Sequence, residues 1–353
     1  MRSVFVGEKI VRQEPCRICG SWEGIKIAET EFWDLQHCDI VQCTSCKLIQ
    51  LDPMISMQNT AIGCHAYYLK EIFETPINEQ KRNLVRNYRR GIVFAASLQK
   101  KGYHPETILE FGPGSGYFTA GIRFIFPECR ITVADIVEDV LINNREIHGY
   151  NVFRGSPEDI HLFEDQKFDL IVARDILEHF TDIGKVTRNI GALLNPKGLF
   201  HFITPNGKED VWGHYLNWEF NKKPSELLIN HVNYFDGKGL LECLAGSGFS
   251  RIEYFTYQVK YTLRGKGWKH AKRLAVPVST KQSAAELIRS QEKQAPRDSV
   301  RKEDILDVFI FRTKIIWLIT LYCRLKHHWI IHINPARNVG HEINGLFIKK
   351  DDG

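Results

Sequence analysis

A run of glycines between two apolar segments constrains this chain more than any other feature. In "TILEFGPGSGYFT", residues 107–119, an apolar run ends at Glu110, and glycines follow at Gly112, Gly114 and Gly116. The next residues, "YFTAGIRFIF", have the apolar spacing of a helix. The segment therefore predicts a strand, a glycine loop and a helix, in which the bare backbone allows a ligand to approach closely.

A carboxylate follows at the spacing that nucleotide-binding α/β units use. The apolar run "RITVAD" predicts a second strand that ends at Asp135, close to 20 residues beyond Gly116. In such units an acid at about this offset binds the ribose hydroxyls. The sequence thus predicts a site in which the glycine loop admits a nucleotide and Asp135 holds its sugar.

The loop fits S-adenosylmethionine better than a dinucleotide. A dinucleotide loop has a third glycine three residues after its second, but Tyr117 stands there, and a pyrophosphate would face the carboxylate of Glu110. S-adenosylmethionine has no phosphate, and its amino and sulfonium groups are cations that tolerate a nearby acid. We therefore favour S-adenosylmethionine over NAD.

Two Cys-x-x-Cys pairs near the start of the chain predict a structural zinc site. Each pair forms a tight knuckle, and two knuckles supply four thiolates, which leave no open position for catalysis on the metal. The predicted ligands are Cys16, Cys19, Cys43 and Cys46. His37 and Cys38 lie between the pairs, as alternative ligands or, as we expect, in a loop near the metal.

The ordered motifs resemble those of class I S-adenosylmethionine-dependent methyltransferases. The motifs are "EFGPGSG", Asp135, "RGSPEDI", "FDLIVARDILEHF", "LLNPKGLFHFITPN" and "NHVNYFDGKGLLECLAGSGF", in order between residues 105 and 257. They look most like the branch of ubiquinone-pathway O-methyltransferases. The paired-cysteine segment resembles the zinc knuckle that precedes such domains in many bacterial members, and it is also similar to the front of sugar C-methyltransferases.

The apolar runs predict an α/β fold, a Rossmann-like, mainly parallel sheet with helices on both faces. Its seven strands are expected at 107–110, 130–135, 152–154, 168–173, 199–204, 251–257 and 345–349. The resemblance implies that the last strand is antiparallel. We expect five segments: a zinc-binding segment (1–55), a helical linker (56–103), the methyltransferase core (104–258), a basic and amphipathic helical insertion (259–340) and the final core strand (341–353).

The resemblance also implies roles for residues around the cofactor. Glu110 would hold the methionine amine, the three glycines would admit the cofactor along the backbone, and Asp135 would take the ribose hydroxyls. The remaining predicted contacts are Ile136 and Ser156–Pro157 at the adenine and the Arg174 backbone at the methionine end. Read singly, Asp135 could instead cap a helix and the glycines could form a tight turn.

Two histidines are candidates for the general base. A hydroxyl acceptor must lose its proton, and imidazole titrates near neutral pH. His179 follows the fourth predicted strand and His231 opens "HVNYF" after the fifth. Asp175, Glu178 and His179 also form an acid-x-x-Glu-His pattern that resembles one linked to Mg²⁺ in some ubiquinone-pathway relatives, although acids at the start of a helix serve its dipole equally well.

The acceptor is predicted to be a saccharide or nucleotide-sugar hydroxyl. The segment "DVWGHYLNWEF", residues 210–220, offers Trp212 and Trp218 for stacking on a ring or as a packed lid. Residues 260–302 contain twelve Lys or Arg against three Asp or Glu and could contact a phosphate or an anionic surface, or form a solvated helix face.

The alternatives are a quinone-like phenol acceptor, sugar C-methylation, and a non-enzymatic module that binds zinc and a nucleotide. No recognised nucleic-acid-binding module is present, so no nucleic-acid partner is expected. The first residues, "MRSVFVGEKIVRQE", carry charges among few apolar residues, so no secretory signal is expected. No apolar run approaches the roughly 20 residues of a membrane helix, and an odd number of cysteines favours reduced thiols. We expect a cytoplasmic protein.

Overall fold

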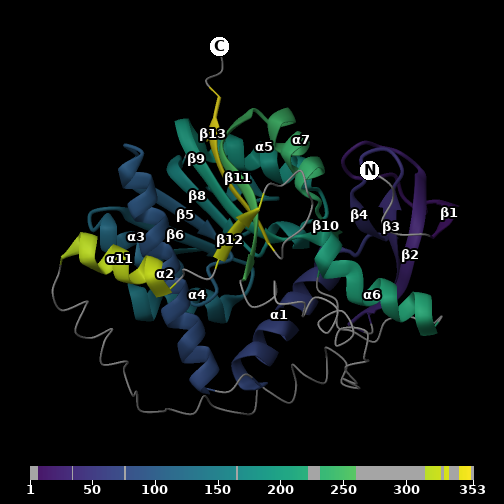
Figure 1. Cartoon of the computed structure of the whole chain (residues 1–353), viewed down its shortest axis with the longest axis horizontal. Helices are drawn as coiled ribbons and strands as arrows, with labels where there is room; N and C mark the ends of the chain where they lie inside the picture. The colour runs from purple at the N-terminus through teal and green to yellow at the C-terminus, as the bar shows by residue number, and fades with distance from the viewer. Residues whose placement is uncertain are drawn as a thin grey trace.

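The computed structural model describes two β-sheets and the helices that pack on them (Figure 1). The described residues are 7–33, 35–74, 77–163, 166–221, 231–259, 315–326, 330–333 and 342–350. The basic stretch 260–302 lies outside them, so the structure leaves the expectation of a basic helical insertion open there.

The larger sheet has the strand order β12-β11-β13-β9-β8-β5-β6-β7. Its strands are β5 (Thr107–Phe111), β6 (Arg130–Asp135), β7 (Asn151–Arg154), β8 (Phe168–Arg174), β9 (Leu194–Pro205), β11 (Phe249–Val259), β12 (Ile330–Ile333) and β13 (Glu342–Lys349). Strands β7, β6, β5, β8 and β9 are parallel, and β13 is antiparallel to β9 and β11. The predicted seven-stranded Rossmann-like sheet is confirmed, and β12 adds an eighth strand at the edge.

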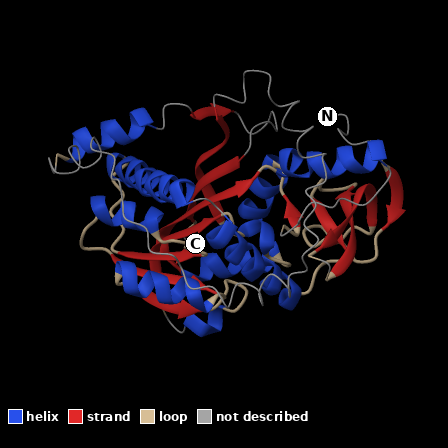
Figure 2. Ribbon diagram, turned by 90° about the horizontal axis from the view of Figure 1, so that it is seen from below, coloured by secondary structure: helices blue, strands red, loops and turns tan. Residues whose placement is uncertain are grey.

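Alternating residues of the central strands face two separate cores. Ile108 packs with helices on one face, and Leu109 packs with helices on the other. The first face is covered by α2 (Ile77–Lys100), α3 (Tyr117–Ile125), α4 (Glu138–His148) and α11 (Ile316–Lys326), and the second by α5 (Ile183–Leu193) and α7 (Gly237–Gly246). Figure 2 shows the resulting layers from below. Both faces are buried, which explains why these strands read as continuous apolar runs.

The helices that flank the site cross at close range. A Cβ at Gly91 of α2 would lie 1.9 Å from the Phe118 carbonyl oxygen, and one at Gly121 of α3 would lie 2.1 Å from that of Tyr88. Only glycine allows this approach, so it fixes α3, and with it the end of the glycine loop, against α2.

The smaller sheet contains the N-terminal strands and one short strand from the middle of the chain. Its order is β1-β2-β3-β4-β10, with β1 (Glu8–Val11), β2 (Glu23–Phe32), β3 (Gln36–Cys43), β4 (Ile49–Asp52) and β10 (Asn233–Tyr234). Helix α6 (Gly207–Asn221) packs on this sheet, and α1 (Met57–Glu74) leads from it toward α2 (Figure 1). The segment around residues 231–235 therefore connects the two sheets.

The expected loop at His37 and Cys38 is wrong, because both residues lie within β3. Nδ1 of His37 lies 2.7 Å from a carboxylate oxygen of Glu31 across the β2-β3 hairpin. Cys38 is fully buried in the core between this sheet and α6. Both residues belong to the β2-β3 ladder. The group of four cysteines includes neither of them.

Across the described part of the chain, no helix has both the length and the apolarity needed to cross a bilayer. The last described helix, α11, packs on α2, where the Arg89 guanidinium lies 5.3 Å from the ring centroid of Tyr322.

Candidate active site

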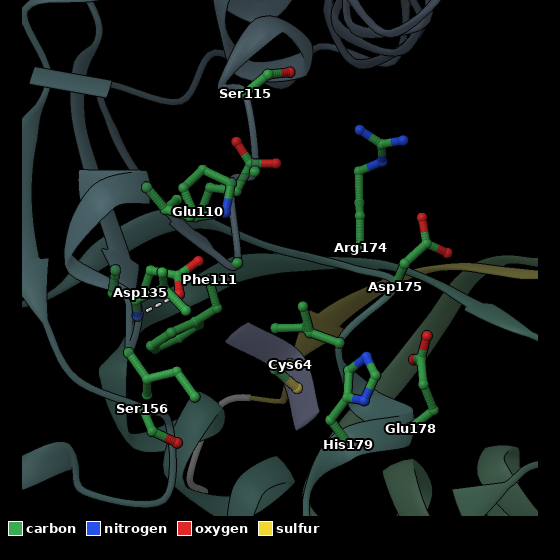
Figure 3. Close-up of a pocket in the computed structure, with 18 of the residues that line it drawn as sticks. Cys64, Glu110, Phe111, Ser115, Asp135, Ser156, Arg174, Asp175, Glu178 and His179 are labelled. Carbon is green, nitrogen blue, oxygen red and sulfur yellow. Dashed lines mark hydrogen bonds between the residues drawn. The ribbon is translucent and has the colours of Figure 1, made fainter. Parts of the chain in front are cut away.

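A cavity of about 880 Å³ opens at the carboxyl ends of β5, β6 and β8 (Figure 3). This edge is where open α/β sheets bind their ligands. Predicted site residues that line the cavity are Glu110, Gly112, Gly114, Asp135, Ile136, Ser156, Pro157, Arg174, His179 and His231. In Figure 3 Glu110, Asp135 and Ser156 lie on one side and Glu178 and His179 on the other. Gly116 is not among the lining residues.

All three loop glycines adopt the left-handed conformation, with φ of 63° at Gly112, 51° at Gly114 and 72° at Gly116. A Cβ at Gly116 would lie 2.1 Å from the side-chain oxygen of Asn144, whereas one at Gly114 would meet no atom within 4 Å. Gly114 thus leaves space at the cavity wall, and Gly116 allows the loop to pack against α4. Gly116 therefore affects the cavity indirectly, through the packing of the loop on α4.

Glu110 is buried at the end of β5, with 1% of its surface exposed. Burial raises its pKa to about 7, although the charge of Arg174 and a hydrogen bond donated by the Thr119 hydroxyl lower it. The Arg174 guanidinium lies 4.1 Å from the ring centroid of Phe118 and donates to Oδ1 of Asn87 at 3.4 Å. Arg174 was expected to act through its backbone, but its side chain also belongs to this wall of the cavity.

Asp135 ends β6 with its carboxylate at the cavity. Its Oδ1 accepts the Val137 N–H at 2.9 Å, and burial raises its pKa to about 6 against the hydrogen bonds from Val137 and Ile136. The N-cap of helix α4 is Val137, which makes no side-chain cap, so Asp135 lies two residues before the capping position. The next residue, Ile136, keeps 40% of its surface exposed although it is apolar. An apolar side chain beside a desolvated carboxylate is suited to contact with a nucleobase and its ribose.

Ser156 and Pro157 line the cavity. Ser156 is 8% exposed, and its hydroxyl accepts the Glu158 N–H at 3.2 Å. Asn189 of α5 holds the same turn by donating to the Pro157 carbonyl at 2.7 Å. The serine therefore helps to shape the turn that borders the cavity.

His231 is held in a line of charged groups at the opposite side of the cavity. Its Nδ1 lies 2.6 Å from Oδ2 of Asp210, and its Nε2 lies 3.9 Å from Oε1 of Glu178. The other Glu178 oxygen accepts the Thr204 hydroxyl at 2.8 Å. The His179 ring meets the His231 ring edge-on, with centroids 5.1 Å apart. The structure thus brings together the two histidines that the sequence singled out separately.

The electrostatics of these groups favour a charged pair of His231 and Asp210. Burial by itself lowers the pKa of His231, but the charge and hydrogen bond of Asp210, together with Glu178 and Asp175, raise it to about 9. Burial raises the pKa of Glu178 to about 8, against the lowering effect of His231. Asp210 was missed as a site residue. It opens the aromatic segment in the sequence, and no local spacing connects it to His231.

Asp175, Glu178 and His179 do not lie together on one face of a helix. Asp175 has a left-handed φ of 54°, and only Leu177–His179 form a single 3₁₀ turn. Ligand atoms of Glu178, His179 and His231 approach one another within 4.8 Å, but this group of three does not include Asp175. Nδ1 of His231 contacts Asp210, and its Nε2 lies near Glu178, so these side chains form an ion-pair network.

The tryptophans of α6 do not face the cavity. Trp212, Tyr215 and Trp218 pack against the core of the smaller sheet, and the rings of Trp212 and Tyr215 stack at 5.4 Å between centroids. The cavity lining includes neither tryptophan. The ring-stacking interpretation of this segment is therefore wrong, and the packing interpretation holds, because α6 buries its aromatic side chains against β2 and its neighbours.

The four paired cysteines meet at one point beside the smaller sheet. Sulfur atoms of Cys16 and Cys46, and likewise of Cys19 and Cys43, are 3.5 Å apart, and all four lie within 4.8 Å of one another. Zn–S bonds of about 2.3 Å in a tetrahedron give sulfur separations of this size. The residues present therefore fit a tetrahedral ion. Cys16 and Cys43 are buried in the core cluster that contains Leu240 of α7, so the knuckle packs directly on the larger domain.

The strand order and the cavity at the carboxyl edge of the sheet define a Rossmann-like α/β domain. Residues 79–254 match the family described as a methyltransferase domain. This part of the chain therefore resembles a methyltransferase domain.

Individual relatives match over shorter stretches. The malonyl-[acyl-carrier protein] O-methyltransferase of Bacillus anthracis is 28% identical over 98 residues, covering 28% of this chain and 36% of that protein. The ribosomal RNA small subunit methyltransferase G of Streptococcus agalactiae is 31% identical over 81 residues, covering 20% of this chain and 34% of that protein. The chain thus spans about a third of the length of these relatives.

Among solved structures, the plantazolicin methyltransferase BamL, in complex with a desmethyl analogue and SAH, is similar with 11% identity. Its TM-score is 0.42, and the match covers 83% of this chain and 98% of that chain.

Proposed function

We propose that the protein is an S-adenosylmethionine-dependent methyltransferase that acts on a hydroxyl group. One observation carries this proposal: a single cavity contains the buried acid Glu110, the open glycine loop and Asp135 at one side and the His231 line at the other. When bound, S-adenosylmethionine supplies an electrophilic methyl group. The task of the protein is then to align the acceptor, exclude water and remove the hydroxyl proton.

The proposed roles follow the two sides of the cavity. Glu110 binds the ammonium group of the methionine part, Asp135 binds the ribose hydroxyls, and Ile136 and Ser156–Pro157 surround the adenine. His231 is the general base, held by Asp210, and His179 stands beside it as the second candidate.

The test is transfer of a labelled methyl group from the cofactor to an extract of small molecules. No labelled product under any condition, with cofactor binding intact, would favour the non-enzymatic module.

For the acceptor we propose a saccharide or nucleotide-sugar hydroxyl. A sugar hydroxyl is weakly acidic and needs a positioned base, which the Asp210–His231 pair provides. Trp212 and Trp218 pack against the smaller sheet and do not support this choice of acceptor. The relatives do not favour one class of acceptor, since one is named for an acyl-carrier protein and another for ribosomal RNA. A quinone-like phenol, as in the ubiquinone-pathway branch, and sugar C-methylation are the alternatives to be tested.

We further propose that the four cysteines bind one structural Zn²⁺, as in the knuckle that the sequence resembles. We also propose the division into segments 1–55, 56–103, 104–258, 259–340 and 341–353. Strand β10 is an addition to this scheme, because residues from the proposed core complete the sheet of the zinc segment.

Cofactor selectivity is the first prediction. The protein should bind S-adenosylmethionine or its demethylated product, and should not bind NAD, because the loop lacks the third glycine and presents Glu110. Asp135→Ala should weaken cofactor binding by about 1–3 kcal/mol, since hydroxyls buried at the site lose their partner. Isothermal titration calorimetry measures both. Tighter binding of NAD than of S-adenosylmethionine would contradict the assignment.

Cofactor affinity should also rise with pH. Burial raises the pKa of Glu110 to about 7, so the free protein holds this acid partly protonated near neutrality. A bound ammonium group favours the carboxylate, so binding releases a proton, and the affinity increases as pH rises through about 7. Calorimetry in buffers of different ionisation enthalpy measures the released proton. In Glu110→Gln the release should vanish and the affinity should fall at every pH. An unchanged proton count in this variant would contradict the role of Glu110.

A further inference from the structure

The smaller sheet reaches the active-site turn through a chain of hydrogen bonds between buried amides. In the first cysteine knuckle, Arg17 donates its backbone N–H to Oε1 of Gln50 at 3.3 Å. Nε2 of Gln50 donates to Oδ1 of Asn233 at 2.8 Å, and Nδ2 of Asn233 donates to the Phe180 carbonyl at 2.5 Å. Phe180 directly follows His179. Three bonds therefore connect the knuckle with the turn that carries a candidate base.

The backbone makes a second, parallel connection. The Leu51 N–H on β4 donates to the Val232 carbonyl at 3.2 Å, and the Val232 N–H donates to the Glu178 carbonyl at 2.9 Å. Val232 directly follows His231. The same β4-β10 pairing places Asn233 opposite Gln50. His231 is thus fixed between the N-terminal sheet and the turn of Glu178.

The burial of the two amides makes their orientation specific. Gln50 is 0% exposed and Asn233 is 1% exposed, so neither can exchange its partner for bulk water. Each amide accepts at its oxygen and donates at its nitrogen, in one direction from the knuckle to the turn. Removing either amide leaves a buried polar group of the other without its hydrogen-bond partner. Because such a group is costly, we expect the turn to shift rather than keep the unsatisfied group in place.

We propose that Gln50 and Asn233 are positioning residues of the active site, through which the four-cysteine knuckle holds the Glu178–Phe180 turn and His231 in place. The expected effect on kcat rests on the proposed function, whereas the structural connection does not. The N-terminal segment is then part of the catalytic apparatus, because it supplies the wall against which the base is aligned. Displacements of about 1 Å at a reacting group can cost 10²-fold in rate.

The kinetic test is a double-mutant cycle on kcat with Gln50→Ala, Asn233→Ala and the double variant. Each single variant should lower kcat by about 10- to 100-fold while cofactor Kd and zinc content stay unchanged. The double variant should be no slower than the slower single variant, since one relay is broken in every case.

The matched control is Asn195→Ala. Asn195 makes a similar side-chain bond, from its Nδ2 to Oδ1 of Asp169 at 2.8 Å, near the amino end of β8 and away from the cavity. It should keep kcat within about twofold. Values of kcat within twofold in Gln50→Ala and Asn233→Ala, or fully additive losses in the double variant, would overturn the proposal. If Asn233→Ala does not fold, Gln50→Ala decides, since it leaves the bond to Phe180 in place.

Hydrogen–deuterium exchange gives a readout that does not depend on activity. In the full-length protein, Gln50→Ala and chelation of the bound zinc should each speed exchange in peptides that cover residues 176–182 and 231–236, and Asn195→Ala should not. Faster exchange without any methyl transfer would contradict the proposed function and support the relay. Methyl transfer with unchanged exchange and unchanged kcat would contradict the relay alone.

Discussion

Replacement of His231 by alanine is expected to lower kcat by about 10²- to 10⁴-fold on a saccharide hydroxyl, which is the usual contribution of a positioned general base. Cofactor affinity should stay unchanged, because His231 contacts Glu178 and His179. These two residues lie across the cavity from Glu110 and Asp135 (Figure 3). Steady-state kinetics with purified variant and wild type measure the loss. Substitution of His179, the second candidate base, should have a smaller effect, because the Asp210 carboxylate contacts the ring of His231.

The pH dependence identifies the base more sharply than the size of the loss. Asp210 and Glu178 raise the pKa of His231 to about 9, so at neutral pH most molecules hold it protonated. A base acts only when deprotonated, so kcat/KM of the wild type should rise with pH through about 9. In Asp210→Asn the histidine remains but loses the neighbouring charge that raises its pKa, so this limb should move to lower pH. A limb that stays in place in Asp210→Asn would show that another group titrates.

The same variant distinguishes the acceptors. A phenol is far more acidic than a sugar hydroxyl and depends less on a base. If His231→Ala keeps nearly full rate on catechol-like phenols and the wild type prefers them to saccharides, the quinone-like alternative replaces the saccharide proposal. If the variant loses several orders of magnitude with every acceptor, the role of His231 as base stands.

Loss of one knuckle cysteine is expected to have the largest effect on stability. Cys43→Ser should reduce zinc from one ion per chain to a small fraction and lower the free energy of unfolding by several kcal/mol, because the binding energy of a structural zinc is folding energy. Cys43 is also fully buried where the knuckle packs on α7. Elemental analysis and denaturant unfolding measure the two effects.

Cys129→Ala is the matched control for this prediction. Cys129 is a buried cysteine outside the group of four. Its substitution should leave the zinc content intact and cost only the packing of one small side chain. Equal zinc content in Cys43→Ser and Cys129→Ala would contradict the four-thiolate site.

Much of the fold could be predicted because its signals are local. Ile108, Leu109 and Phe111 are apolar because both faces of β5 are buried. The glycines that follow mark positions where the backbone is left-handed. The distance along the chain from Gly116 to Asp135 is set by one helix and one strand, so it follows from element lengths. The cysteine spacing reflects the geometry of a knuckle in the same way.

What only the tertiary structure decided is which distant residues meet. Gln50 and Asn233 are 183 positions apart and form a hydrogen bond because β10 adds to the N-terminal sheet. Asp210 reaches His231 because α6 folds back onto that sheet, and the same packing turns Trp212 away from the cavity. Such contacts depend on the register and packing of whole elements, whereas sequence spacing records only the geometry within an element and its nearest turn.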